Sequence, residues 1–174
     1  MGGSGGNSAA APTSTPPPGP LTSSVPDLDQ ATAAVCDPVM QAMPVTLNDG
    51  SGTTLQPLVV TPGGPSFLAW GNPLVTLQCG VARPGPLTDS SGYVPYAIGP
   101  NSAPGATWLI ELDGDRDIWT TVDRAVYFRV TLPHAEVGYL TDISGVIGKA
   151  LPAVCKGPVE QGDPPDAKYC GSRS

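Results

Sequence analysis

Alternating apolar and polar positions predict antiparallel strands through the middle of the chain. The clearest alternation covers residues 74–81, and a second stretch, 107–112, repeats it. The second stretch ends at Asp113-Gly114, a dipeptide typical of tight hairpin turns. The apolar positions expected to share one face of each strand are Val75, Leu77, Cys79, Val81, Trp108, Ile110 and Leu112.

Residues 117–132 keep one parity of apolar positions throughout, so the pattern alone permits a single long strand. Because strands of about 16 residues are rare, we expect a hairpin that turns near Asp123-Arg124. A short edge strand is predicted over 55–60, because the proline in this segment is poorly tolerated in a central strand. The rest of 45–73 and all of 83–106 are rich in Gly and Pro and are predicted as loops.

Two segments carry apolar residues at helical spacing. Residues 27–43 begin with Asp27 and Asp29, which suit the first turn of a helix through capping and the helix dipole. Pro38 interrupts this segment, which leaves one kinked helix or two short helices as alternatives. Residues 139–154 form the second expected helix, whose apolar stripe is weakened by two glycines.

These elements predict an α+β fold, in which an antiparallel sheet of four to five strands carries two helices packed on one face and is disulfide-bonded. The other face is then solvated or available to a partner. We expect a disordered Pro/Gly/Ser/Thr-rich stalk over 1–26, a single α+β domain over 27–155 and an irregular tail over 156–174. The first six residues resemble a cloning scar, so an N-terminal signal peptide or anchor is expected to have been removed.

Composition narrows the class of partner. The chain carries 22 Gly and 22 Pro, and its 8 basic against 15 acidic residues give a net charge of -7. This balance excludes a general nucleic-acid binder, which needs a basic surface, and argues against a polybasic grip on anionic lipid. No run of about 18 apolar residues is present, so no transmembrane helix is expected.

The four cysteines, Cys36, Cys79, Cys155 and Cys170, indicate export to an oxidising compartment. None of them has zinc-binding spacing, and a single histidine cannot complete a common zinc site. Of the three possible pairings, the sequence separations favour Cys36 with Cys79 and Cys155 with Cys170. A structural role is favoured over a redox-active one, because no cysteine has a cationic neighbour in sequence that would stabilise a thiolate.

Aromatic and arginine side chains on one strand face form the first candidate binding surface. Trp119 has the opposite parity from its apolar neighbours, which places it with Tyr127 and Arg129 on the face without helices. Exposed aromatic and arginine side chains are typical of binding surfaces. The alternative is that a loop covers this face.

Two further residues, Trp70 and Arg124, each have a structural and a functional interpretation. Trp70 either anchors the turn before the strand 74–81 with a buried indole, which we favour, or lines a pocket together with Arg83. Arg124 either pairs with Asp123 to fix its turn, which we favour, or clamps a carboxylate ligand with two hydrogen bonds.

Few residues suggest catalysis or metal binding. The single histidine, His134, would need a nucleophile and an orienting carboxylate nearby to act as a base, and we interpret it as a surface loop residue. Asp113, Asp115 and Asp117 resemble a calcium loop superficially, but the glycine and glutamate that an EF-hand requires are missing. A solvated hairpin tip is favoured, weak calcium binding is the alternative, and no cofactor is expected.

Four segments of the chain, taken in order, resemble a known family. They are AVCDPVMQAMP (34–44), AWGNPLVTLQCGVARP (69–84), TWLIEL (107–112) and TTVDRAVYFRVTLP (120–133). They are similar to the actinobacterial exported family catalogued as domain of unknown function 3515, over about 35–153. The most specific element is the W-G-[DN]-P-x(5)-C-G-V block, in which Asn72 stands where the family often has Asp.

The resemblance implies a location outside the cytoplasm, either secreted or anchored to the outer side of the plasma membrane. It also implies a disulfide between Cys36 and Cys79, and it implies no activity. Cys155 and Cys170 lie in a tail that is not associated with the family.

The combined hypothesis is an exported cell-envelope domain that acts as a non-catalytic binding module. Its partner would be an envelope protein or a cell-wall component. The alternative is a small secreted enzyme, or an enzyme accessory, that acts on cell-wall polymer.

Overall fold

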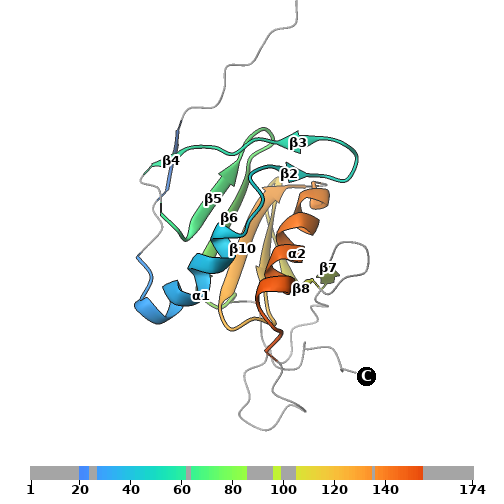
Figure 1. Ribbon diagram of the computed structural model, residues 1–174. Coiled ribbons are helices and arrows are strands. Elements are labelled where there is room, and N and C mark those ends of the chain that lie inside the picture. Colours follow the sequence, from blue (N-terminus) through green and yellow to red (C-terminus); the bar gives the residue numbers. More distant parts are fainter. Residues whose placement is uncertain are drawn as a thin grey trace, which may run out of the picture.

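The structure, a computed structural model, describes residues 20–23, 27–61, 64–85, 96–98, 105–134 and 136–154, with backbone only for 96–98. Within these residues, two helices lie over one face of a six-stranded antiparallel sheet (Figure 1). The strands, in spatial order, are β5 (Phe67–Trp70), β6 (Val75–Val81), β10 (Tyr127–Pro133), β9 (Arg116–Thr121), β8 (Ala106–Asp113) and β7 (Tyr96–Ile98). The helices are α1 (Gln30–Gln41) and α2 (Leu140–Ala150), the latter preceded by a 3₁₀ turn over Val137–Tyr139.

The antiparallel sheet and its pair of helices are confirmed, but the expected number of four to five strands is too low. The six strands include β5 and β7, both of which fall in segments predicted as loops. β5 has four residues, all apolar, and β7 has three. Segments this short offer too few positions for an alternating pattern, so only their pairing in the sheet defines them.

Both predicted hairpin turns are confirmed. Asp113 of β8 lies opposite Arg116 of β9, and Gly114 between them has a φ of 64°, as the first central residue of a type II′ turn requires. β9 and β10 are two paired strands, joined by residues 122–126, rather than one long strand.

The first helix forms where its cap and apolar spacing predict it. Asp29 is the N-cap, and its carboxylate accepts a hydrogen bond of 3.0 Å from the backbone N–H of Thr32. Pro38 lies inside one helix, so the segment does not form the two short helices that were the other alternative. Neither helix in the described part of the chain combines the length and apolar character that crossing a membrane demands.

The second helix is shorter than the predicted 139–154. It ends at Ala150, and the chain is extended from Leu151. Leu140, Ile143 and Ile147 of the predicted stripe are therefore buried, whereas Val154 is 40% exposed.

A disulfide between Cys36 and Cys79 joins α1 to β6, as predicted. The two Cα atoms are 5.8 Å apart, and both residues are fully buried in the main core. Cys155 and Cys170 lie outside the described residues, so the pairing between them stays a prediction.

Next to this disulfide, Gly80 forms a bulge in β6. The register pairs Phe128 with Cys79 and Tyr127 with Val81, which leaves Gly80 as the extra residue, with a φ of 77°. A Cβ atom at this position would meet the Leu28 side chain at 2.5 Å. Only glycine therefore lets the strand bulge toward the start of α1.

We expect Gly80→Ala to lower the free energy of unfolding by about 2 kcal/mol or more, because left-handed backbone costs an L-residue about 1–2 kcal/mol and the new methyl group overlaps Leu28. Gly114→Ala is the matched control, since Gly114 has a φ of 64° but nothing within 4 Å of the position that a methyl group would take. Urea unfolding of both variants measures the difference. Equal losses would contradict a packing role for Gly80.

The segment 55–60 is not the single edge strand predicted for it. Its start belongs to β3 (Thr54–Leu55), which pairs with β2 (Leu47–Asn48), and its end to β4 (Val60–Thr61), which pairs in parallel with β1 (Leu21–Thr22). Pro57 between them makes only an isolated bridge to Trp70. Since a proline cannot donate to a ladder, the segment divides at this position.

β1 lies within 1–26, the range assigned to a disordered stalk. Leu21–Thr22 pair with β4 instead, so this part of the range contacts the fold. Residues 1–19 and 24–26 lie outside the described residues, so the disordered stalk stays a prediction for these two ranges.

The predicted position of Trp119 on the helix-free face is wrong. The register pairs Trp119 with Val130 on one side and with Ile110 on the other, and its side chain is only 4% exposed in the main core. Antiparallel residues that lie opposite each other share a face, so Trp119 points toward the helices. Leu112, expected in the core, is 71% exposed because it lies next to the hairpin tip.

The helix-free face is not uniformly accessible. Leu109 and Thr120 are buried although their strand positions face away from the helices, and Val122, which follows β9, is buried in a cluster with Leu109. Tyr127 and Arg129 lie on this same face, as predicted, and both are half-buried.

Candidate functional site

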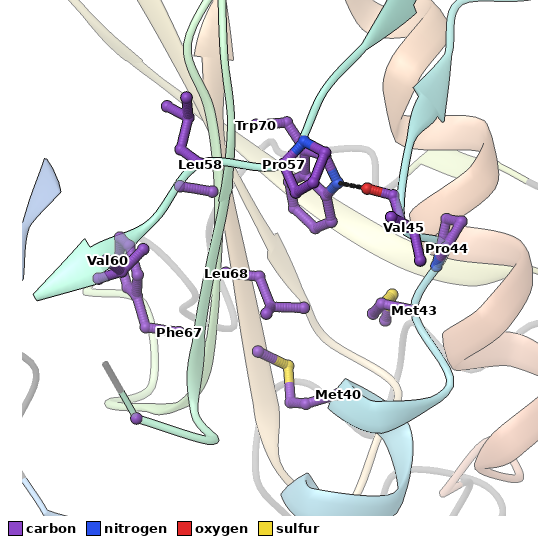
Figure 2. Close-up of a pocket in the computed structure, with 12 residues that line it drawn as sticks. Met40, Met43, Pro44, Val45, Pro57, Leu58, Val60, Phe67, Leu68 and Trp70 are labelled. Atoms are coloured by element: carbon purple, nitrogen blue, oxygen red, sulfur yellow. Dashed lines mark hydrogen bonds between the residues drawn. The ribbon is translucent and has the colours of Figure 1, made fainter. Parts of the chain in front are cut away.

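An apolar pocket lies at the outer edge of β5, between this strand, the end of α1 and the segment that leads into β4 (Figure 2). Its volume is about 400 Å³, within the range of about 300–1,000 Å³ that is usual for ligand pockets. The lining residues are Met40, Met43, Pro44, Val45, Pro57, Leu58, Val60, Gly64, Phe67, Leu68, Ala69 and Trp70.

Trp70 holds the two walls of the pocket together. Its indole N–H donates a 3.0 Å hydrogen bond to the carbonyl oxygen of Val45, which follows the end of α1 (Figure 2). On the other side, the backbones of Pro57 and Trp70 form an isolated antiparallel β-bridge. Next to it, the N–H of Gly71 donates a hydrogen bond of 3.0 Å to the carbonyl of Gln56. The buried indole thus fixes the loop after α1, and the backbone of Trp70 and Gly71 fixes the segment before β4.

The outward edge of β5 pairs with Gly64 at Phe67 and with Pro57 at Trp70. The N–H of Phe67 donates to the carbonyl of Gly64 at 3.3 Å, and the carbonyl of Ala69 accepts from the N–H of Leu58 at 2.8 Å. All four residues of β5 line the pocket. The apolar walls therefore enclose a stretch of strand edge.

The pocket carries no charged side chain among its lining residues, so it suits an uncharged ligand. Met40 and Met43 contribute flexible, polarisable side chains that can adapt to different apolar shapes. Val45 forms part of the rim and is 74% exposed. Covering an apolar side chain at the mouth of a pocket removes apolar surface from water, which favours binding.

The structure places Trp70 in this pocket but does not bring Arg83 to it. Trp70 is 2% exposed and anchors the surrounding segments, as its structural interpretation predicts. Arg83 is exposed beyond the end of β6 and does not line the pocket. Tyr127 and Arg129, on the helix-free face, are separate from it, and Trp119 is in the core.

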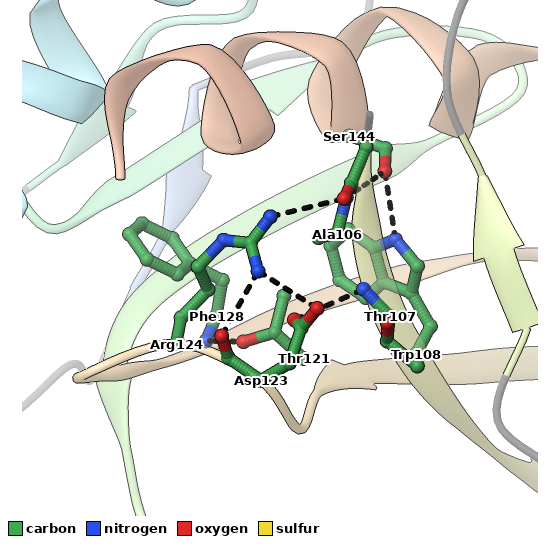
Figure 3. Close-up of polar contacts among 9 residues, drawn as sticks. Ala106, Thr107, Trp108, Thr121, Asp123, Arg124, Phe128 and Ser144 are labelled. Atoms are coloured by element: carbon green, nitrogen blue, oxygen red, sulfur yellow. Dashed lines mark hydrogen bonds and ion pairs between the residues drawn. The ribbon is translucent and has the colours of Figure 1, made fainter. Parts of the chain in front are cut away.

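Arg124 and Asp123 form a buried ion pair at the turn between β9 and β10 (Figure 3). The guanidinium Nη1 lies 2.7 Å from a carboxylate oxygen of Asp123, and Nη2 donates to the carbonyl of Gly105 at 3.0 Å. The other carboxylate oxygen accepts from the N–H of Thr107 at 3.0 Å. The pair thus fixes its turn against β8, which is the alternative favoured over a ligand clamp.

Ser144 of α2 completes this polar layer beneath the helix (Figure 3). Its hydroxyl oxygen accepts from the indole N–H of Trp108 and from the backbone N–H of Ala106, both at 2.9 Å. All three residues are fully buried. The hydroxyl therefore ties α2 to β8, and Trp108 is a core residue, as predicted.

At the opposite end of β9, His134 pairs with Asp117. The imidazole side chain is 59% exposed, whereas the carboxylate is largely buried. Asp113 and Asp115 are exposed at the adjacent hairpin tip. Among the described residues, no group of three or more His, Cys, Asp or Glu side chains could hold a metal ion.

Another acidic residue, Asp49, organises the loop between β2 and β3. Its carboxylate accepts from the hydroxyl of Ser51 at 2.6 Å and from the backbone N–H of Ser51 and Thr53. The hydrogen bond from the Ser51 hydroxyl is the largest cause that lowers the pKa of Asp49 to about 2. These bonds lie within one loop and shape it, so they do not form a site.

Sequence reasoning missed most of the pocket. Phe67 and Leu68 lie in a strand too short to show a period, and Leu58 and Val60 lie in a segment dense in Gly and Pro. The one local signal was Trp70, for which a pocket-lining position was one of two interpretations.

Of three comparisons with known proteins, the comparison with family models gives a match. The model of the family described as "Protein of unknown function (DUF3515)" matches residues 7–155. No curated protein and no solved structure matches the chain.

Proposed function

Given that this chain belongs to the DUF3515 family of proteins of unknown function, we propose that it is a non-catalytic binding module of the cell envelope. It acts outside the cytoplasm and holds an apolar group of an envelope partner in the pocket at the edge of β5. The observation that carries this proposal is the pocket itself, with its apolar walls and its exposed rim.

The disulfide supports the extracytoplasmic location. Cys36 and Cys79 are fully buried and joined in the centre of the core. Disulfides persist in oxidising compartments and are rare in the cytosol. A core built around this bond suits a protein that folds after export.

The distribution of polar groups supports binding rather than chemistry. The buried charges of Asp123 and Arg124 are engaged with each other and with the backbone of β8, and the hydroxyl of Ser144 is engaged with Trp108. The pocket offers apolar contact area and main-chain groups instead. Such a lining binds through burial of apolar surface.

The test is a charge placed at the rim. We expect Val45→Asp to weaken binding of the neutral fluorescent probe N-phenyl-1-naphthylamine about tenfold, because binding would strip water from the new carboxylate. Val59→Asp is the matched control, since Val59 is 72% exposed, like Val45 at 74%, but does not line the pocket. Fluorescence titration gives both affinities.

Two results would contradict the proposal. Equal weakening by Val45→Asp and Val59→Asp would show that the probe binds elsewhere. No fluorescence increase with the unmodified protein would show that the pocket does not accept an apolar ligand.

A further inference from the structure

We propose that Asp113 is a site of spontaneous covalent modification, at which its side chain condenses with the backbone nitrogen of Gly114. The product is a succinimide ring, which water opens to an isoaspartyl residue. The reaction needs no reactant other than water. It concerns the β8–β9 hairpin and is independent of the apolar pocket, none of whose lining residues belongs to this hairpin.

The reaction exchanges one peptide bond for another without oxidation or reduction. The nitrogen of Gly114 attacks the carbon of the protonated side-chain carboxyl of Asp113. The new C–N bond closes a five-membered ring, and the carboxyl OH leaves with the amide proton as water. A second water then adds to one of the two ring carbonyls. Addition at the side-chain carbonyl restores aspartate, whereas addition at the main-chain carbonyl breaks the old peptide bond and leaves the chain running through the side chain.

The described residues contain two Asp-Gly dipeptides, Asp49-Gly50 in the β2–β3 loop and Asp113-Gly114 at the β8–β9 turn. A glycine after the aspartate leaves the attacking nitrogen unshielded, because it has no side chain. Gly50 and Gly114 are alike in this respect. Their φ angles are 81° and 64°, and neither has an atom within 4 Å of the position that a Cβ would take. The two dipeptides can therefore be compared by the hydrogen bonds of their reacting groups.

At Asp49-Gly50 both reacting groups are engaged. The N–H of Gly50 donates to the side-chain oxygen of Asn48 at 2.8 Å. The carboxylate of Asp49 accepts from the hydroxyl of Ser51 and from the backbone N–H of Ser51 and Thr53. The bond from the Ser51 hydroxyl is the largest cause that lowers the pKa of Asp49 to about 2. The protonated carboxyl, which is the form that loses water, is therefore rare at this position.

At Asp113-Gly114 neither reacting group is held in this way. Both residues are exposed. Between described residues, no hydrogen bond or ion pair uses the Asp113 carboxylate or the Gly114 N–H. Asp113 and Arg116 form the last pair of the hairpin, and such an end opens at low free-energy cost. The other two aspartates of the hairpin, Asp115 and Asp117, precede residues with large side chains that shield the nitrogen.

The product changes the tip of the hairpin. An isoaspartyl residue adds one carbon atom to the main chain before Gly114 and leaves a free carboxylate on the Cα atom of residue 113. The type II′ turn joins β8 to β9 through a two-residue loop, so the added atom should loosen the pairing of Asp113 with Arg116. The new carboxylate is a substrate for methyl transfer by a protein isoaspartyl methyltransferase, which makes the modification measurable.

The experiment incubates the full chain in weakly acidic buffer and measures isoaspartate by enzymatic methyl transfer from S-adenosylmethionine. Digestion with a protease that cuts before aspartate but not before isoaspartate then locates it by mass spectrometry. We expect Asp113 to convert at least about tenfold faster than Asp49, because a pKa lowered from 3.8 to about 2 makes the protonated carboxyl scarcer by more than this factor. Asp113→Glu should abolish conversion at this position, since its side chain would have to close a six-membered ring.

A second variant tests the reason for the difference. Asn48→Ala/Ser51→Ala removes the acceptor of the Gly50 N–H and the largest cause of the low pKa, so Asp49 should then convert faster. An unchanged rate at Asp49 in this variant would overturn the assigned cause. In the unmodified protein, conversion of Asp49 before Asp113 or at an equal rate would overturn the proposal. No conversion of Asp113, while a capped Leu-Asp-Gly-Asp-Arg peptide converts in the same buffer, would also overturn it.

Discussion

Replacing Cys36 and Cys79 together by alanine is expected to lower the free energy of unfolding by about 4 kcal/mol. The two cysteines are separated by 43 positions in the sequence. The chain-entropy model assigns about 4 kcal/mol to a disulfide that closes a loop of this length. Small domains have total stabilities of only about 5–15 kcal/mol. The double variant should therefore unfold at a much lower urea concentration.

Two comparisons control this result. Reductant should destabilise the unmodified protein by a similar amount and the double variant much less. Cys170→Ser is expected to cost much less, because Cys170 lies in the tail beyond the folded core predicted from the sequence. Equal and negligible losses for all variants would contradict a structural role for the Cys36–Cys79 bond.

Asp123→Ala is expected to cost about 3–5 kcal/mol, because it leaves a buried charge without its partner. The side chains of Arg124 and Asp123 are 2% and 6% exposed, and their closest atoms are 2.7 Å apart. The substitution also removes the acceptor of the Thr107 N–H. Chemical denaturation at neutral pH measures the loss.

The control for this prediction is a second aspartate at a hairpin turn. Asp113 is exposed next to the β8–β9 turn, so Asp113→Ala should change stability by no more than about 0.5 kcal/mol. The double variant Asp123→Ala/Arg124→Met should recover part of the loss, because it removes the orphaned guanidinium as well. If Asp123→Ala behaved like Asp113→Ala, the ion pair would have no role in fixing its turn.

Local patterns were sufficient for the elements with a clear period or cap. Asp29 caps α1 where the sequence predicts a helix start, and β6 buries Val75, Leu77 and Cys79 on one face. The Asp113-Gly114 turn needed only the conformational freedom of glycine. Each of these features depends on residues within a few positions of one another, so sequence spacing is enough to define it.

The face of Trp119 could not be decided in this way. Its parity along the chain is opposite to that of the apolar residues of β10, which suggested the helix-free face. The length of the turn at 122–126 sets the register instead, and this register places Trp119 opposite Val130. A hairpin loop longer or shorter by one residue would exchange the faces, so parity has meaning only within one strand.

The sequence by itself determined the two helices and the antiparallel hairpins, because apolar period, caps and turn residues act locally. The sequence separations and the family resemblance favoured the pairing of Cys36 with Cys79, and the structure confirms it. Only the tertiary structure decided the pocket. Its walls come from the end of α1, the edge of β5 and the segment before β4, and they meet because Trp70 bonds to Val45 and Pro57 bridges to Trp70. Contacts between residues distant in sequence leave no local period, since they form only when the chain packs.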